Sequence, residues 1–208
     1  MALLSPADRA RALEAIRAAE ARTAGEFIVA IARESDSYQS GPLLAAGIAA
    51  LIIPNALLLA APLDASSHVV AQLALFATVF ALCSWPPIRL RLTPAATRAR
   101  RVRRAALDLF FSQGVHAAPS RSGILLYVSL AEHQVELVAD VGIDSRVAPG
   151  AWDGVVAAFV ARMRQGVAGG GVGSGLAAAI SGIGDILATH FPAAPGQANE
   201  LPDRLIEL

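Results

Sequence analysis

The sequence predicts an α/β fold: a small mixed β-sheet with helices on both faces, interrupted by a two-helix transmembrane hairpin. Three observations support this class. Helix-like and strand-like hydrophobic patterns follow one another on both sides of the most apolar region. Residues 1–36 supply only one helix and one strand, too little for a core of their own. Between Asp36 and Arg89 the single acidic or basic residue is Asp64, which leaves two long uncharged runs.

The N-terminal flank predicts a helix followed by a buried strand. Residues 5–22 form the helix, with Ser5 as its N-cap and Pro6 in the first turn. Residues 26–35 form the strand. Its centre is a nearly continuous apolar run, which is typical of a strand buried on both faces.

Residues 43–63 and 69–88 predict two transmembrane helices joined by a short loop. The first run would form a helix of roughly 31 Å, which matches the hydrocarbon core of a bilayer. The alternative, two core helices of a water-soluble bundle, requires a polar stripe that neither run has. Within the first run, the Asn55 amide could pair with Gln72 or Thr78 of the second. Otherwise Pro54 and Asn55 mark a simple kink.

Arginine placement predicts the orientation. Arginines lie on both outer flanks of the two runs and none lies between them, so the positive-inside rule puts both termini in the cytoplasm. Tyr38 and Trp85 are expected as interfacial aromatics on that side. Five arginines next to the second run are expected to fix the topology and to attract anionic lipid: Arg98, Arg100, Arg101, Arg103 and Arg104. This position, with zero net charge, predicts no nucleic-acid partner.

The C-terminal flank predicts a helix, a β-hairpin and two further helices. The helix starts at 93–94 and reaches about 113, the strands cover 123–130 and 135–140, and the last helices cover 150–165 and 174–190. Residues 193–208 are expected to be a loose tail. Residues 1–36 and 94–192 then form one discontinuous domain, in which the first strand and the Gly123 strand are parallel neighbours.

Several segments carry a resemblance to a known family. "TAGEFIVAIARESDSY", "FFSQGVHAAPSRSGILLYVSLAEHQVELVADVGI", Trp152 and "GLAAAISGIGDILATHFP" together resemble the TPM domain family, specifically its membrane-embedded bacterial branch. The resemblance covers residues 5–36 and 94–192. It implies a three-layer α/β fold with a small sheet between helices. Some exported members are linked to photosystem repair, to receptor accessory roles, or to a weak phosphatase activity with bound calcium.

Asp140 and Asp144 are the candidate metal ligands. Asp140 ends the second strand of the β-hairpin, and with Asp144, helped by Glu26 or Asp36, it could offer oxygen ligands to Ca²⁺ or Mg²⁺. The alternative is a turn residue that hydrogen-bonds its own backbone. The glycine-rich stretch 166–175 lacks the lysine of a phosphate-binding loop and is expected to be a flexible link.

These features lead to two functional hypotheses. The first is an integral inner-membrane protein that presents a TPM-like domain to the cytoplasm as a binding, assembly or quality-control module. Its partners would be the bilayer and either a membrane protein or a second copy of the chain. The alternative is a metal-assisted phosphomonoesterase centred on Asp140, in which the metal would polarise the phosphate and activate water. The sequence shows no matching nucleophile.

Overall fold

The chain forms two compact units. The computed structural model describes residues 3–58, 64–117, 121–165, 171–193 and 204–208. Residues Met1–Ser35 and Ala99–Leu208 make up the first unit, called here the α/β unit. Residues Asp36–Arg98 make up the second, called the hairpin unit.

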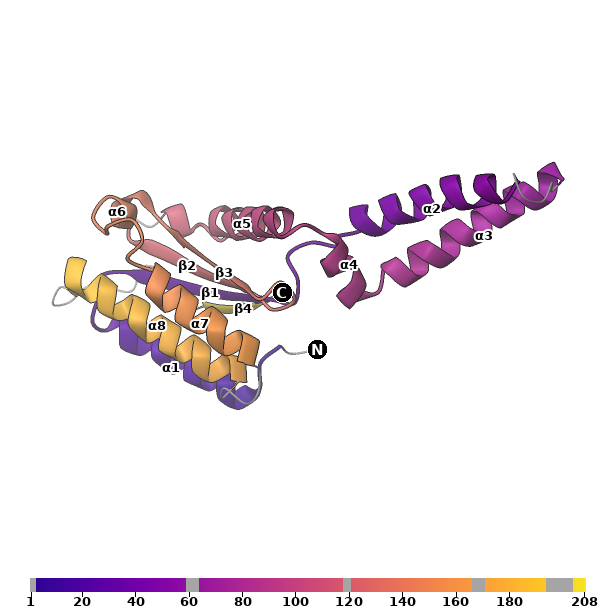
Figure 1. The fold of residues 1–208 in the computed structure, drawn as a ribbon. Helices are drawn as coiled ribbons and strands as arrows, with labels where there is room; N and C mark the ends of the chain where they lie inside the picture. The colour runs from indigo at the N-terminus through magenta and orange to yellow at the C-terminus, as the bar shows by residue number, and fades with distance from the viewer. Residues whose placement is uncertain (1–2, 59–63, 118–120, 166–170, 194–203) are drawn as a thin grey trace. The chain divides into compact units, whose positions relative to one another are not determined.

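A four-stranded mixed sheet forms the centre of the α/β unit, with the strand order β3-β2-β1-β4 (Figure 1). Strand β1 pairs in parallel with β2 and with β4, whereas β2 and β3 are antiparallel. The parallel pairing of the first strand with the Gly123 strand and the β-hairpin are therefore confirmed. The strands span Glu26–Ala32 (β1), Gly123–Ser129 (β2), Gln134–Ala139 (β3) and Arg204–Glu207 (β4).

Strand β4 corrects the prediction of a loose C-terminal tail. Residues Arg204–Glu207 extend the sheet beside β1, and Leu205 joins the buried core. Residues 194–203 of the predicted tail lie outside the described residues. Such a short edge strand is stabilised by its neighbour β1, and its own hydrophobic pattern is too brief to predict it.

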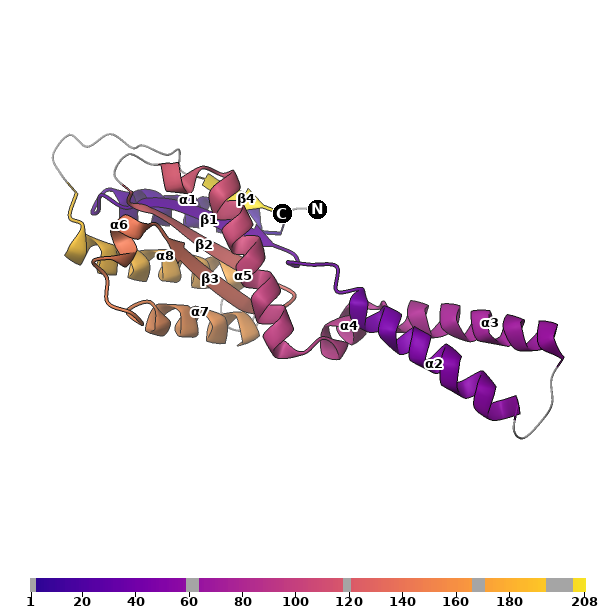
Figure 2. The ribbon, with the colours of Figure 1, turned by 90° about the horizontal axis from the view of Figure 1, so that it is seen from above.

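Helices cover both faces of the sheet, as the sequence predicts (Figures 1 and 2). On one face, Phe27, Val29 and Ile31 of β1 belong to the core that α1, α7 and α8 close. On the other face, Ile28 and Ala30 share a second core with α5. All seven residues of β1 are therefore buried. The helices of this unit span Pro6–Glu20 (α1), Ala95–Ser112 (α5), Val141–Asp144 (α6), Asp153–Gln165 (α7) and Gly171–His190 (α8), and a short 3₁₀ turn covers Val115–Ala117.

Two local features fix the helices of the larger core. Ser5 caps α1, since its side chain accepts a hydrogen bond from the Asp8 amide at 3.1 Å. Gly184 lets α8 lie directly against α1, because a Cβ there would be only 2.8 Å from Ala19 Cβ. Helix α8 begins at Gly171, so the last part of the glycine-rich stretch is helical rather than a link.

The hairpin unit is built from two antiparallel helices that lie side by side (Figures 1 and 2). They span Ser40–Leu58 (α2) and Ala65–Cys83 (α3), and the last five residues of the first predicted span lie outside the described residues. Asp64 caps α3, so this helix begins four residues before the predicted span. The end of α2 carries Pro54, which is buried within the helix pair.

The Asn55 side chain does not pair with the second helix. Its Nδ2 donates to the Leu51 carbonyl, one turn back on α2, at 2.6 Å. Thr78 likewise donates to a carbonyl of its own helix at 2.8 Å. The predicted partnership with Gln72 or Thr78 is therefore wrong, and the interpretation of a local irregularity in α2 is the one that fits.

The second predicted span is broken near its end. Helix α3 stops at Cys83, and a separate short helix, Pro86–Leu92 (α4), follows. Its two N-terminal prolines cannot donate the backbone bonds that would extend α3, but they suit the first turn of a new helix. Tyr38, expected at an interface, is instead 0% exposed, with a positive φ of 51°.

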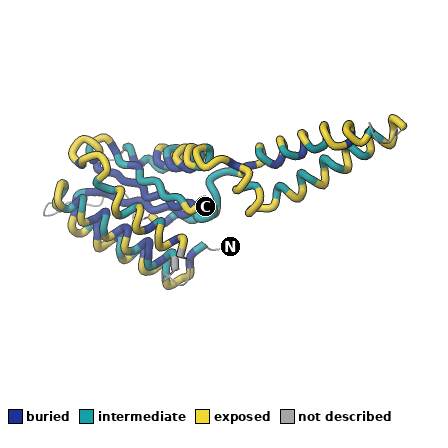
Figure 3. The backbone as a smooth tube through the Cα atoms, viewed as in Figure 1, coloured by how far each residue is buried: buried dark blue, intermediate teal, exposed yellow. Residues whose placement is uncertain are grey.

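Burial differs sharply between helices of the two units (Figure 3). Within the described residues three helices are long and apolar enough to cross a membrane by length and composition alone: α2, α3 and residues Val172–His190 of α8. In α8, 44% of the residues in the most apolar stretch of the helix are buried, because the helix packs on α1 and α7. The corresponding values are 17% for α2 and 0% for α3. Helix α8 therefore finds its apolar environment inside the protein, whereas α2 and α3 do not.

Candidate functional site

Asp140 lies where β3 ends and α6 begins. It is 3% exposed and is the N-cap of α6. Its Oδ1 accepts a hydrogen bond from the Val141 amide at 2.7 Å and lies 3.5 Å from Nη1 of Arg121. Gly142 lets the Arg121 backbone lie close to α6, since a Cβ there would lie 2.3 Å from the Arg121 carbonyl oxygen. The geometry is that of a backbone cap paired with a cation.

The other predicted ligands are not gathered around Asp140. Asp144 lies on the exposed side of α6. Glu26 is buried at the start of β1, opposite Gly123, and Asp36 belongs to the hairpin unit, where it accepts from the Tyr38 amide. Within the described parts of the chain, no group of three or more His, Cys, Asp or Glu side chains is placed to hold a metal ion.

One observation keeps the metal hypothesis open. The second carboxylate oxygen of Asp140, Oδ2, is buried and has no hydrogen-bond partner among the described residues. A buried carboxylate oxygen without a partner is costly, so this atom has capacity for a cation or a donor. Ca²⁺ takes six to eight oxygen ligands, which Asp140 and an exposed Asp144 do not supply. The described residues therefore do not fit a complete metal cage.

A cleft of about 460 Å³ lies at the carboxyl ends of β1 and β2. In α/β proteins this edge is the usual position for ligands, especially where the chain leaves adjacent strands in different directions. That condition is met beside β1, because the chain leaves β1 for β2 on one side, whereas β4 on the other side is reached only after β3. The cleft is lined by Ala32, Glu34, Ser35, Ala105, Asp108, Leu109, Ser112, Tyr127 and Leu208.

A buried network of hydroxyl groups and one carboxylate shapes this cleft. The Ser35 hydroxyl lies 3.2 Å from the Tyr127 hydroxyl and 2.7 Å from that of Ser129. Ser129 donates to the Glu132 carboxylate at 2.5 Å, and the Ser35 amide donates to the same carboxylate at 2.9 Å. The network ties the segment after β1 to the β2–β3 turn and holds the Tyr127 hydroxyl in the cleft wall.

The electrostatics of the cleft favour binding of a polar or cationic group. Burial raises the pKa of Tyr127; the hydrogen bond from Ser35 opposes this shift and the Glu132 charge adds to it. Tyr127 therefore remains a neutral hydrogen-bond donor at physiological pH. Glu34 and Asp108 are the charged residues among the described lining, which includes no arginine. This lining is poorly suited to phosphate.

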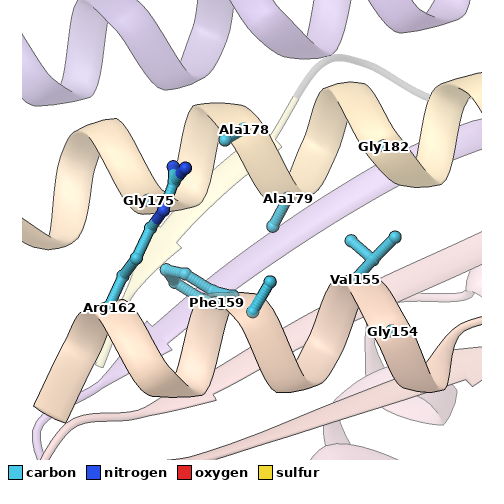
Figure 4. Close-up of a pocket in the computed structure, with 9 residues that line it drawn as sticks. Gly154, Val155, Phe159, Arg162, Gly175, Ala178, Ala179 and Gly182 are labelled. Carbon is cyan, nitrogen blue, oxygen red and sulfur yellow. The ribbon is translucent and has the colours of Figure 1, made fainter.

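A second cavity of about 310 Å³ lies between α7 and α8. Its walls are small or apolar apart from Arg162, which extends from α7 toward Gly175 of α8 (Figure 4). A Cβ at Gly175 would lie 3.1 Å from the Phe159 ring, so the glycine allows close helix packing. The described lining carries no nucleophile and no acid, and the cavity is best explained by that packing.

The five arginines that were predicted to attract anionic lipid differ in their surroundings. All five lie on α5; Arg98, in its first turn, is assigned to the hairpin unit, and the other four are assigned to the α/β unit. Arg103 forms an ion pair with Glu136 of β3 at 3.2 Å, which fastens α5 to the sheet. Arg100 and Arg104 are exposed, and Arg101 is half-buried. A role in binding anionic lipid stays a prediction for these side chains.

The cleft network was not predicted from the sequence. Its members come from two stretches far apart in the chain, Ser35 and residues 127–132, and show no characteristic spacing. The available signal was that Ser129 ends an otherwise apolar buried strand, which indicates a polar group with a specific partner.

Comparison with known proteins identifies the fold and nothing finer. No family model matches the chain, and the search of curated proteins found no match. Among solved structures, the chain is similar to the NMR structure of the BA42 protein from the psychrophilic bacterium Bizionia argentinensis, with 19% identity and a TM-score of 0.62. The alignment covers 99% of this chain and 96% of BA42. The chain therefore shares the overall α/β fold of BA42.

Proposed function

We propose that the chain is an integral membrane protein whose hairpin unit spans the bilayer and whose α/β unit is a binding module. The observation that carries this proposal is the exposure of apolar side chains on α2 and α3. Of the residues of α3, all of which are described, none is buried, and Leu73 is 65% exposed. On α2, Leu51 is 67% exposed. A continuous apolar surface of this kind is unfavourable in water and favourable in lipid.

The dimensions of the hairpin agree with a bilayer. Helices α2 and α3 contain 19 residues each, which corresponds to about 28 Å of helix. The hydrocarbon core is about 30 Å thick. The Ser84 hydroxyl donates to the Gln39 side chain at 3.3 Å, so the chain enters and leaves the hairpin at the same end. Both flanks therefore emerge on one side of the membrane.

Arginine placement supports the cytoplasm as that side, and we take the membrane to be a bacterial inner membrane. No lysine or arginine lies between Arg33 and Arg89, so α2, α3 and the loop that joins them carry none. The resemblance to the membrane-embedded branch of the TPM family supports the same arrangement. We assign binding to the cleft at the carboxyl ends of β1 and β2, with a membrane protein or a second copy of the chain as the partner class.

Cysteine accessibility tests the topology. The single native cysteine, Cys83, is replaced by serine, and a cysteine is introduced at Ser66 or at Ser145, both of which are exposed. A membrane-impermeant maleimide should label the Ser66→Cys variant in intact spheroplasts and the Ser145→Cys variant only after permeabilisation. Labelling of the Ser145→Cys variant from outside would overturn the orientation.

A metal-assisted phosphomonoesterase centred on Asp140 is the second candidate, favoured only by the buried Oδ2 atom without a described partner. Asp140 would supply one ligand, and the described residues do not supply the others. Calorimetric titration with Ca²⁺ and Mg²⁺ tests this directly, with Asp140→Asn as the control. The hypothesis requires binding by the wild type that the variant loses, accompanied by phosphomonoester hydrolysis. Absence of metal binding would exclude it.

A further inference from the structure

The short helix α4 and its N-cap residue carry an exposed apolar stripe, formed by Trp85, Ile88 and Leu92. We infer that α4 is an interfacial anchor: it lies in the membrane surface with this stripe at the boundary between headgroups and acyl chains. The inference rests on the proposed function, because it requires that the hairpin unit be inserted in a bilayer. It adds a second kind of membrane contact to the two spanning helices.

The spacing and exposure of the stripe support this position. Trp85, Ile88 and Leu92 are separated by three and four residues, which places them on one side of a helix. They are 64%, 40% and 43% exposed, respectively. An isolated helix of seven residues is unstable in water, so an exposed apolar side is best explained by contact with a non-aqueous phase.

The depth of α4 follows from the length of α3. Helix α3 is about as long as the hydrocarbon core is thick, and it stops at Cys83. Trp85 therefore emerges at headgroup level, where tryptophan is enriched in membrane proteins. Leu82, one turn earlier, is 58% exposed, so the apolar surface of α3 runs directly into the stripe.

Contacts with the start of α2 hold α4 in place. The Arg89 guanidinium donates to the Ser37 carbonyl at 2.8 Å. A Cβ at Gly41 would lie 3.3 Å from Leu92 Cβ, so the end of α4 lies directly against the first turn of α2. The stripe is therefore fixed at the end of the hairpin from which both flanks emerge, where a membrane surface would contact it.

The charge around α4 selects an anionic lipid surface as the occupant. Arg89 and Arg91 lie within the helix, and the sequence contains no acidic residue between Asp64 and Asp108. Each arginine near an anionic leaflet adds electrostatic attraction. Arginines beside an apolar stripe, with no acidic residue nearby in the sequence, are typical of an interfacial helix.

Tryptophan fluorescence tests the inference on the full chain. Trp85 and Trp152 are the two tryptophans, so a Trp152→Phe variant reports on Trp85 alone, and a Trp85→Phe variant provides the matched control. Both are reconstituted in vesicles that contain lipids brominated either near the carbonyl or near the acyl terminus. We expect Trp85 to be quenched at least twofold more by the shallow bromines than by the deep ones, and Trp152 by neither.

The outcomes separate this inference from the proposed function. If the protein floats with the vesicles but Trp85 is unquenched, or is quenched more by the deep bromines, the anchor is overturned and the spanning hairpin stands. If the protein does not float with the vesicles, the proposed function fails first. Trp85 emission should also lie at shorter wavelength with phosphatidylglycerol than with phosphatidylcholine alone, and Arg91→Gln should reduce this difference. An unchanged spectrum would overturn the preference for anionic lipid.

Discussion

Replacing Glu132 by leucine should destabilise the α/β unit by about 3 kcal/mol. Glu132 is 5% exposed and accepts hydrogen bonds from the Ser129 hydroxyl and the Ser35 amide. Leucine would leave both donors without this acceptor. Ser129 is 0% exposed, so its hydroxyl would carry most of the cost, about 2 kcal/mol. Ser35 is half-buried, so its amide can hydrogen-bond to water instead, and the loss of this bond should cost about 1 kcal/mol.

Two control variants make this prediction specific. Glu132→Gln keeps one acceptor oxygen but replaces the other by an NH2 group, so it can accept only one of the two hydrogen bonds and should cost about 1 kcal/mol. Glu14→Gln changes an exposed carboxylate of α1 and should stay within about 0.5 kcal/mol of the wild type. The expected order of stability is therefore wild type and Glu14→Gln, then Glu132→Gln, then Glu132→Leu.

Thermal unfolding of the full chain in detergent measures this order. Trp152 fluorescence in a Trp85→Phe background reports on the α/β unit, because Trp152 packs against its core. At about 4 °C per kcal/mol, Glu132→Leu should lower the midpoint by roughly 12 °C. If Glu132→Leu and Glu14→Gln have the same unfolding midpoint, the buried network does not stabilise the α/β unit and the prediction is refuted.

Three further predictions concern packing and pH. Gly123→Ala should destabilise the α/β unit by about 2 kcal/mol in the same melts, because its Cβ would lie 2.6 Å from the Val115 carbonyl oxygen. Gly154→Ala is the control: no described atom lies within 4 Å of its Cβ, so it should be neutral or slightly stabilising. Equal unfolding temperatures for the two variants would contradict this prediction. Stability should fall as pH rises above about 10.0, where unfolded tyrosine ionises while folded Tyr127 retains its proton. Tyr127→Phe should reduce this loss, as measured by melts across alkaline pH. Glu207 should contribute stability that is present above its ordinary pKa of about 4.5 and lost as pH falls, because the hydrogen bond from a backbone amide lowers its pKa. Melts of Glu207→Gln should depend less on acidic pH, and an unchanged profile would argue against that bond.

The central strands could be predicted because the pattern of apolar residues in each strand indicates which of its faces are buried. The apolar residues of β1 form a nearly unbroken run, which indicates burial on both faces, and the two cores confirm it. Strand β4 could not be predicted, since four residues stabilised by a neighbouring strand have little pattern of their own. Hydropathy also misplaced the second span, because it averages over Pro86 and Pro87, where the helix breaks.

The site was less predictable than the fold for a physical reason. A hydrophobic pattern shows which face of a strand is buried, but it does not show which polar groups meet across the sheet. Ser35 and Ser129 are 94 positions apart, and their contact depends on the parallel register of β1 and β2. Asp140 was noticed because it directly follows a strand, yet its contact with Arg121 depends on a loop conformation that spacing does not encode.

Membrane extraction of the full chain tests the central claim most directly. Membranes from expressing cells are washed with alkaline carbonate, which removes peripheral proteins, and are then floated on a density gradient. The exposed apolar surfaces of α2 and α3 predict that the chain stays with the floating lipid and is released only by detergent. Recovery of folded chain in the carbonate supernatant would contradict the membrane-spanning hairpin.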